Sequence, residues 1–220
     1  MVEIPEGSGW IGALGDDKFA NDTERPPILV NCRGFFLGRA PVTVGEFRHF
    51  RPDHEPGIPP DWPVAWVSWL DAMAYCRWLG DGYRLPTEAE WEFACRAGSR
   101  APFFCGEALT SADANYLYDE NGKRVGPGHR TPPGTYPPNA FGLLDMAGNV
   151  NEWVEDCWHP SHAGKPSEAS QPAEGDPRRR VLRGGSWDYL PRLLRSCWRD
   201  WLFADCRRDN VGFRVARDLE

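Results

Sequence analysis

The segments Arg180-Val-Leu-Arg-Gly-Gly-Ser-Trp187 and Asn210-Val-Gly-Phe-Arg-Val-Ala216, separated by an irregular stretch, decide how this chain folds. Residues 211–215 alternate apolar side chains with a glycine and an arginine, the period of two that is typical of a half-buried strand. The Gly184-Gly185 pair indicates a backbone turn or a close approach to another segment. Both ends therefore read as fixed framework.

The stretch between these ends, residues 188–209, has neither the strand period nor the helix period. It mixes large aromatic side chains with aspartates and arginines. A core segment would repeat regularly, and a solvated loop would contain fewer aromatics. A rigid frame that holds such an insert indicates a binding surface. The residues predicted to contact a ligand are Asp188, Tyr189, Leu190, Arg192, Leu193, Leu194, Cys197, Trp198, Asp200, Trp201, Leu202, Phe203, Ala204, Asp205, Cys206, Arg208 and Asp209.

Length and charge narrow the classes of function. The 220 residues predict one domain, 1–220. The net charge of −7 argues against a nucleic-acid partner bound through phosphates. No run of about 18 apolar residues is present, so no membrane span is predicted. The amino terminus lacks signal-peptide features, which favours the cytoplasm and leaves export or surface display open.

Capping boxes predict three helices. They lie at Thr43-x-x-Glu46, Ser68-x-x-Asp71 and Thr87-x-x-Glu90. The second box has Asp in place of Glu and opens a helix over 69–79, which Gly80 ends. Gly98 closes the third helix.

Two short apolar runs, 28–30 and 35–37, predict strands, and Arg33-Gly34 between them suggests a hairpin. Residues 100–139 are rich in Gly and Pro, so little regular structure is expected there. Residues 159–179 are polar and predict an exposed or disordered loop.

The seven cysteines are odd in number and form no CxxC pair, which argues against a disulfide framework or a structural zinc site. Cys197 and Cys206 lie inside the insert. A catalytic thiol is one interpretation of them, but no activating base lies nearby in sequence, and variation of a surface is favoured.

Several motifs match one family. They are Met1-Val-Glu-Ile-Pro-x-Gly, Pro41-Val-Thr-Val-x-Glu-Phe, Pro63-Val-x-x-Val-Ser-Trp, Tyr83-Arg-Leu-Pro-Thr-Glu-Ala-Glu-Trp-Glu, Gly142-Leu-Leu-Asp-Met-Ala-Gly-Asn-Val-Asn-Glu-Trp and Arg183-Gly-Gly-Ser-Trp with Gly212-Phe-Arg. Together they resemble the formylglycine-generating (sulfatase-modifying factor) enzyme domain. The resemblance implies the C-type lectin fold of that type, α+β, with short antiparallel strands, few helices and much irregular structure.

The resemblance does not extend to the catalytic residues. Formylglycine-generating enzymes use two cysteines just after the Gly-Gly-Ser-aromatic motif, and those positions fall on about Tyr189 and Leu194. Neither residue can supply a thiolate ligand for copper. The ergothioneine-type relatives need a histidine-rich iron site in an additional domain, and the five histidines of this chain suggest no such cluster.

The carboxyl end also resembles the variable protein of a diversity-generating retroelement. Such proteins end in a fixed Arg-Gly-Gly-Ser-Trp segment, a diversified segment and a fixed Val-Gly-Phe-Arg strand. The resemblance implies adenine-directed copying errors in Asn codons, which do not produce Lys, Glu, Gln or Met, and residues 188–209 contain none of them. Trp198 and Trp201 need another template codon or are fixed. The resemblance makes 180–220 the variable ligand-binding region, in which Pro191, Arg195, Ser196 and Arg199 fit fixed framework.

A calcium site is predicted at Asp145, Gly148, Val150 and Glu152. Two carboxylates on a tight turn suit a hard cation, and the resemblance supplies the two carbonyl ligands, from Gly148 and Val150. The alternative is a capped turn in which Glu152 pairs with an arginine. Any ion would be structural, and no catalytic cofactor is expected.

These observations predict a non-enzymatic, hypervariable protein that binds a protein or another macromolecule. One alternative is a formylglycine-type oxidase that acts on a sulfatase cysteine through Cys197 or Cys206. Another is a structural domain of a larger assembly, favoured if residues 188–209 are buried against the core. Fold alone does not choose between them.

Overall fold

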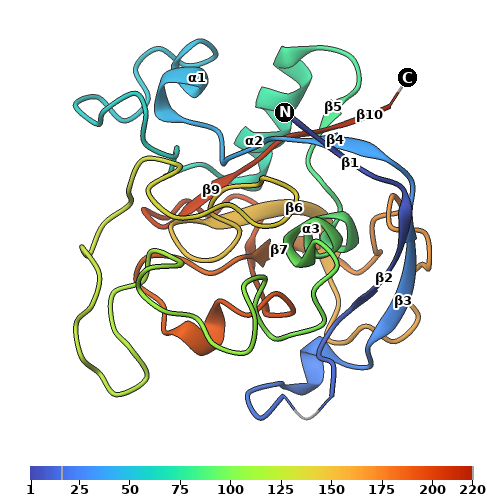
Figure 1. The fold of residues 1–220 in the computed structure, drawn as a ribbon. Helices are drawn as coiled ribbons and strands as arrows, with labels where there is room; N and C mark the ends of the chain where they lie inside the picture. Colours follow the sequence, from blue (N-terminus) through green and yellow to red (C-terminus); the bar gives the residue numbers. More distant parts are fainter. Residues whose placement is uncertain (16, 220) are drawn as a thin grey trace.

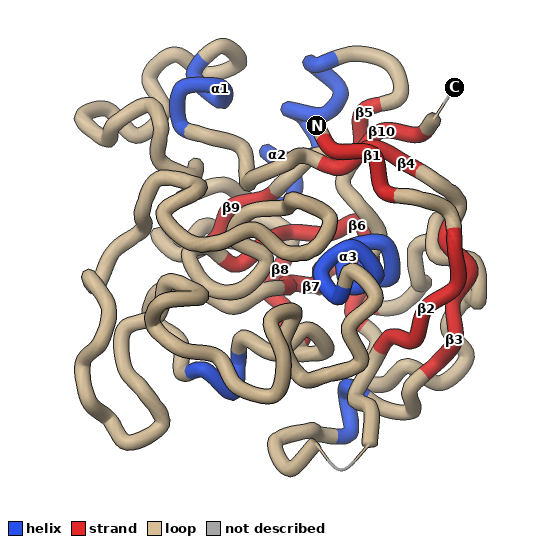
Figure 2. The backbone as a smooth tube through the Cα atoms, viewed as in Figure 1, coloured by secondary structure: helices blue, strands red, loops and turns tan. Residues whose placement is uncertain are grey.

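The computed structural model describes residues 1–15 and 17–219 (Figure 1). Short strands, short helices and long irregular connections alternate along the chain, as Figure 2 shows, and confirm the expected α+β class. The elements are β1 (Val2–Ile4), β2 (Gly7–Ile11), η1 (Asp22–Glu24), β3 (Ile28–Cys32), β4 (Phe35–Leu37), α1 (Val44–Arg48), α2 (Trp69–Leu79), β5 (Tyr83–Arg84), α3 (Glu88–Arg96), β6 (Asn151–Trp158), β7 (Asp176–Arg183), η2 (Pro191–Leu193), β8 (Arg199–Phe203), β9 (Val211–Phe213) and β10 (Ala216–Asp218).

The described residues form three sheets. The central sheet has the order β8-β7-β6-β9, in which only β6 and β9 are parallel. A second sheet, β1-β4-β10-β5, contains strands from both ends of the chain, because β1 and β10 each pair with β4 (Figure 1). The third is the β2-β3 ladder. The last forty residues supply β8, β9 and β10 and thus help to build two of the three sheets.

The central sheet is buried on both faces. Trp153 and Val154 are consecutive in β6 but belong to different apolar clusters, and Val181 and Leu182 of β7 do the same. One cluster packs the sheet against α3, β2 and β3, and the other packs it against α1 and α2. Each large side chain buried in this way contributes about 1.5–3 kcal/mol, so packing on both faces stabilises the frame around residues 188–209.

The three predicted helices are confirmed, each with a complete capping box. Thr43, Ser68 and Thr87 each accept a hydrogen bond from the backbone of the third helical residue, and the acidic side chain of that residue accepts one from the backbone N–H of the cap. The box with Asp71 is therefore as complete as the two boxes with Glu. No helix in the described part of the chain is long and apolar enough to span a bilayer.

The hairpin predicted between 28–30 and 35–37 is wrong. β3 pairs with β2, whereas β4 lies between β1 and β10. Gly34 does not adopt a positive φ. A Cβ there would lie 2.7 Å from Leu219 Cδ1, so the glycine permits a close approach and does not make a turn.

Two predictions about irregular segments have different outcomes. Regular structure is absent from 100–139 among the described residues, as expected. The loop predicted over 159–179 is shorter, since β7 begins at Asp176, and it is partly buried. Ala169 and His162 are inaccessible to solvent. The loop is held to β3 because Asn31 bonds through its backbone to Ser167 and Ala169, at 2.7 and 2.8 Å.

Candidate functional site

The frame of the insert has the predicted form. Val181 and Leu182 of β7 and Val211 and Phe213 of β9 are buried. Gly184 and Gly185 adopt φ of 89° and 69°, and a Cβ at Gly185 would lie 2.7 Å from the carbonyl oxygen of Leu193. The glycine pair therefore lets the insert fold back tightly on the end of β7.

The middle of the insert, Leu194–Arg199, is buried, and we call it the anchor segment. Leu194, Cys197 and Trp198 were predicted to contact a ligand, but their side chains are only 1%, 1% and 6% exposed. Leu194 packs in an apolar cluster with Phe103 and Tyr116. These three residues are therefore excluded from the candidate surface, because what surrounds them is the protein itself.

Arg195 holds the anchor segment to the amino-terminal loop. Its guanidinium donates to both oxygens of Glu24, at 2.7 and 2.8 Å, and to Asp17 at 2.7 Å. The carbonyls of Phe19 and Arg192 accept its other hydrogens. Such buried, bidentate pairs are strong because few water molecules compete for them.

Arg199 makes the second buried attachment. It donates to both oxygens of Glu88, at 2.6 and 2.8 Å. Burial opposes ionisation of Glu88, but Arg199, Lys165 and Arg183 outweigh it and hold the pKa of this carboxyl well below its usual value. The carboxylate is thus charged and fully engaged by framework cations.

Arg183 completes the attachment from the frame side. It pairs with Glu92 at 2.6 Å and donates to the backbone carbonyls of Ser196, Cys197 and Trp198. Because these bonds go to backbone carbonyls, they do not depend on the side chains of Ser196, Cys197 and Trp198.

Asp17, Glu24 and Cys197 form the one group of potential metal ligands found among the described residues. The Arg195 guanidinium already lies within it, 3.2 Å from the Cys197 sulfur. Burial raises the pKa of the Cys197 thiol, and the charges of Glu92 and Glu24 raise it further. The cluster therefore favours a neutral thiol beside an arginine, the opposite of what a nucleophile or a copper ligand requires.

The remaining parts of the insert, Asp188–Leu193 and Asp200–Asp209, are its surface segments. Their side chains are partly or fully exposed, Pro191 excepted. The predicted contact residues that they supply are Asp188, Tyr189, Leu190, Arg192, Leu193, Asp200, Trp201, Leu202, Phe203, Ala204, Asp205, Cys206, Arg208 and Asp209.

Part of the second surface segment is a strand that the sequence analysis missed. β8 lies at the edge of the central sheet and pairs with β7, Trp201 opposite Val181 and Phe203 opposite Arg179. The Trp201 and Phe203 rings meet edge to face at 5.5 Å, and Arg179 lies 4.2 Å from the centre of the Trp201 ring. The period of two could not be recognised in the sequence, because Leu202 is apolar and lies between the two aromatic residues.

Tyr189 and Asp188 are held by local contacts at the start of the insert. Tyr189 meets the buried Trp198 ring edge to face at 5.4 Å, and burial with the charge of Asp200 raises its pKa to about 12. Asp188 accepts hydrogen bonds from Ser186 at 2.6 Å and from Asn210 at 3.0 and 3.1 Å. The two ends of the insert are thereby joined.

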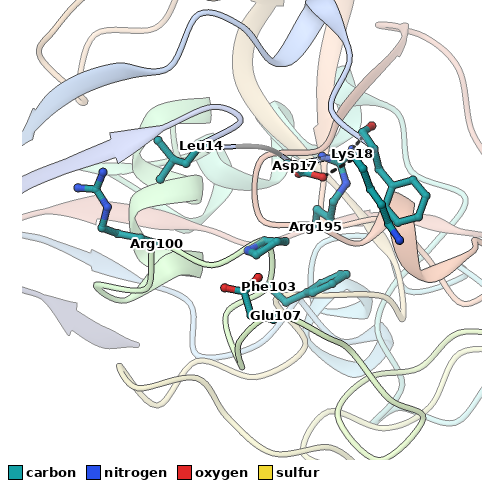
Figure 3. Close-up of a pocket in the computed structure, with 10 residues that line it drawn as sticks. Leu14, Asp17, Lys18, Arg100, Phe103, Glu107 and Arg195 are labelled. Atoms are coloured by element: carbon teal, nitrogen blue, oxygen red, sulfur yellow. Dashed lines mark hydrogen bonds and ion pairs between the residues drawn. The ribbon is translucent and has the colours of Figure 1, made fainter.

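A cavity of about 560 Å³ lies beside the anchor segment (Figure 3). Asp17 and Arg195 meet at its wall, and Lys18, Phe103 and Glu107 line other parts of it. The five donors of Arg195 are already used by protein oxygens and a sulfur, so its charge is neutralised before any ligand arrives.

At the predicted calcium site, Glu152 is paired with an arginine, as the alternative interpretation of this turn expected. Glu152 accepts two hydrogen bonds from Arg214, both at 2.6 Å, and one from Trp91 at 2.8 Å. Burial raises the pKa of Asp145 to about 6. Arg214 thus supplies the charge that a cation would give to Glu152. Calcium at Asp145, Gly148, Val150 and Glu152 stays a prediction, and an increase in melting temperature on replacing EDTA with calcium would support it.

The positions expected to hold catalytic cysteines in a formylglycine-generating enzyme contain Tyr189 and Leu194, one half-buried and one buried. The model of the sulfatase-modifying factor enzyme 1-like domain matches residues 1–219. This chain belongs to that family.

Relatives of the sulfatase-modifying factor family differ in their names. Hercynine oxygenase from Mycolicibacterium thermoresistibile is 33% identical over 94% of this chain, which spans 56% of that protein. The structure of PvdO from Pseudomonas aeruginosa is 33% identical, with a TM-score of 0.87 over 99% of this chain and 93% of its own. Treponema denticola variable protein 1 shares the fold, with 23% identity and a TM-score of 0.80 over 100% of this chain and 95% of its own. The C-type lectin fold of the formylglycine-generating type is thereby confirmed.

Two residues outside the insert, not predicted from the sequence, are bonded to its second surface segment in this sulfatase-modifying factor domain. Trp66 donates its backbone N–H to Arg208 at 2.8 Å, and Leu70 donates to Ala204 at 3.3 Å. The available signal was Trp66 itself, an aromatic in one of the two open positions of Pro63-Val-x-x-Val-Ser-Trp.

Proposed function

We propose that this chain is a non-enzymatic ligand-binding protein, in which the surface segments present changeable side chains on a fixed C-type lectin frame. The ligand in this proposal is a protein or another macromolecule. The observation that carries it is the division of the insert: Arg195 and Arg199 attach its middle to framework carboxylates, while its two outer parts face solvent. Side chains in the outer parts can therefore change while the attachment stays intact.

The chemistry of the surface segments supports recognition. Tyr189, Trp201 and Phe203 offer aromatic area, and Arg208 offers a planar fork for carboxylates. Aromatic and arginine side chains dominate binding energy at protein interfaces. The resemblance of residues 180–220 to the variable region of a diversity-generating retroelement supports the same proposal.

A randomisation experiment tests the division directly. Codons for Tyr189, Trp201, Phe203 and Arg208 would be randomised together in a displayed library, and the protease-resistant fraction would be counted by sequencing. We expect most variants to remain folded. A matched library, randomised at Leu194, Arg195, Cys197 and Trp198, should lose most of its folded members. Equal losses in both libraries would contradict the proposal.

The proposal that residues 180–220 are diversified by a retroelement can be tested in the genome. The neighbouring DNA should encode a reverse transcriptase and carry a near-copy of the codons for 180–220 with additional adenines. If neither is found, binding could still hold, but the diversified origin of the surface would not.

The second candidate is a formylglycine-type oxidase, favoured by the family and by a relative named formylglycine-generating enzyme, from Bos taurus, which is 37% identical over 81% of this chain and of which the match covers 50%. The pKa of Cys197 is raised by burial and by two carboxylates, which opposes this reading. Incubation with copper and a cysteine-containing sulfatase peptide separates the candidates. Formation of the peptide aldehyde, lost on Cys197→Ser or Cys206→Ser, would replace our proposal with the oxidase.

A further inference from the structure

Position 192, in the first surface segment, is held by hydrogen bonds to its backbone. The backbone N–H of Arg192 donates to Oε1 of Glu120 at 2.7 Å. The carbonyl oxygen of Arg192 accepts from Nε of the buried Arg195, also at 2.7 Å. Both backbone polar groups are therefore bonded by residues that lie outside the surface segments, whereas the side chain of Arg192 is 40% exposed.

The turn that contains Arg192 offers no acceptor of its own to this N–H. η2 begins with Pro191, which has no N–H to bond. Leu193 donates to the carbonyl of Leu190 at 2.9 Å, and the next residue donates to that of Pro191 at 2.8 Å. Leu190, at the cap position, has no side-chain oxygen that could accept the remaining N–H. A carboxylate from another part of the chain supplies the acceptor, and hydrogen bonds to charged acceptors are the stronger ones.

Glu120 lies in a turn that is held by its own hydrogen bonds, residues 117–125, which we call the Glu120 loop. The backbone N–H of Asp119 donates to the carbonyl of Lys123 at 2.9 Å, and the carboxylate of Asp119 accepts from the N–H of Lys123 at 2.9 Å. Val125, at the base of the loop, packs in the same apolar cluster as Leu193 of the insert. The loop is thus placed beside the first surface segment by contacts that do not involve the side chain of position 192.

The two oxygens of the Glu120 carboxylate depend differently on the residue at position 192. Oε1 accepts a backbone N–H, which every residue except proline can donate. Oε2 accepts from the side chain of Arg192 at 2.6 Å, a bond that exists only when this position carries a suitable donor. The paired side chains are 34% and 40% exposed, so their charge interaction is worth little. The backbone bond is what a changed side chain leaves intact.

We propose that Glu120 is a positioning residue of the ligand-binding surface, which holds the first surface segment in one backbone conformation whichever side chain position 192 carries. The inference rests on the proposed function and deepens it. Glu120 lies outside 180–220, the region expected to vary, so every variant of the insert would keep this acceptor. A segment held in place before binding loses less conformational freedom when a ligand binds, which favours affinity.

Amide hydrogen exchange at residue 192, followed by NMR of the full chain, tests the bond itself. Glu120→Ala should raise the exchange rate of this amide by about tenfold or more, because a hydrogen bond to a charged acceptor is lost. Glu120→Gln should retain most of the protection, since the side-chain oxygen of glutamine still accepts an N–H. Arg192→Ala should also retain it, once the rate is corrected for the unstructured alanine amide. An unchanged rate in Glu120→Ala, or equal losses of protection in Glu120→Ala and Arg192→Ala, would overturn the inference.

Two controls distinguish a local effect from a general loss of stability. Glu3→Ala removes an exposed carboxylate from β1, in the second sheet, and should leave the amide of residue 192 unchanged. The amide of Trp198 donates to the carbonyl of Arg195 at 2.9 Å within the anchor segment and should stay protected in Glu120→Ala. Faster exchange at Trp198 as well would mean that Glu120 supports the whole fold, and the inference would be lost.

A binding experiment separates this inference from the proposed function. A displayed library randomised at Tyr189, Leu190 and Arg192 would be selected against lysozyme as a model protein target. Adding Glu120→Ala to the selected binders should weaken binding by about tenfold or more, including clones with neither Arg nor Lys at position 192. Glu120→Gln should weaken binding by less than about threefold.

The outcomes of the selection have different meanings. Binders indifferent to Glu120→Ala would contradict the inference and leave the proposed function standing. A loss confined to clones with Arg or Lys at position 192 would show that Glu120 acts through the ion pair, which also contradicts the inference. A library in which nothing binds counts against the proposed function, and amide exchange at residue 192 then decides the role of Glu120 by itself.

Discussion

Arg195 and Arg192 are three residues apart in the same insert, yet they occupy opposite environments. Arg195 is 1% exposed and shares its charge with Glu24 and Asp17. Arg192 is 40% exposed and pairs with Glu120, which is itself 34% exposed. One arginine attaches the insert to the frame, and the other belongs to its surface. The same residue type is therefore a buried attachment at one position and a solvent-facing side chain at the other.

The same contrast separates the anchor segment from the surface segments. Polar groups in the anchor segment are satisfied by framework carboxylates and carbonyls, so a substitution there leaves a buried partner without its bond. Side chains on the surface segments exchange their contacts with water at little cost. Tolerance to change is thus set by what each side chain faces.

The largest effect is expected from Arg195→Leu. It would leave Glu24 and Asp17 without their cation in a buried site, which costs about 3–5 kcal/mol of unfolding free energy. Arg192→Leu should cost less than about 1 kcal/mol, as exposed pairs do. Urea unfolding of both variants measures the difference, and equal losses would abolish the distinction between the two segments.

Trp198→Ala is expected to have the next largest effect. Its side chain is 6% exposed and packs against Tyr189, so removal leaves a cavity that costs about 3 kcal/mol. Phe203→Ala, at a position 45% exposed, should cost below about 1 kcal/mol. A Phe203 loss as large as that of Trp198 would mean that β8 belongs to the core.

The frame was predictable from the sequence because its signals are local. Capping boxes at Thr43, Ser68 and Thr87 each need four consecutive residues, and all three helices form where expected. Alternation over 211–215 predicted a half-buried strand after Asn210; β9 forms there over Val211–Phe213, but it is buried on both sides and Arg214 is buried as well. The resemblance to a known family added the order in which these pieces assemble.

The division of the insert was not predictable, because partners distant in the chain decide it. Arg195 is buried by Glu24 and Asp17, and Arg199 by Glu88, all more than a hundred residues earlier. Composition gave no sign that Trp198 points inward and Phe203 outward. The hairpin at Gly34 was predicted wrongly for the same reason: the residue that requires a glycine there is Leu219, which is distant in the chain.

A smaller effect should depend on pH. Asp71 joins the second surface segment to α2 through Arg207 at 2.8 Å. Burial opposes its ionisation, but Arg207, Ser68 and Arg51 lower its pKa to about 2. A depressed pKa adds stability above the unfolded value of 3.8 that is lost as pH falls towards 2.

Asp71→Asn should therefore reduce the unfolding free energy at neutral pH by about 1–2 kcal/mol, since both arginines are half exposed. The difference in unfolding free energy between Asp71→Asn and the unmodified protein should become smaller as the pH falls from 3.8 towards 2. Unfolding measured at a series of acidic pH values would show this. Asp218→Asn, at an exposed carboxylate paired with Arg84, is the matched control. A gap independent of pH would show that Asp71 acts through shape and not through charge.

The smallest effect on stability is expected at a cysteine of the insert, and the two cysteines there should also differ in thiol reactivity. Cys206→Ser, in a surface segment, should change the unfolding free energy by less than about 0.5 kcal/mol. Cys197 should resist iodoacetamide in the native protein at mildly alkaline pH, because its thiol is buried and its pKa is raised. Cys206 exposes part of its side chain and should be alkylated before Cys197, as mass spectrometry of peptides would report. Rapid native labelling of Cys197 would mean that the anchor segment opens in solution, and a thiol that opens to solvent beside Arg195 is what the oxidase candidate needs.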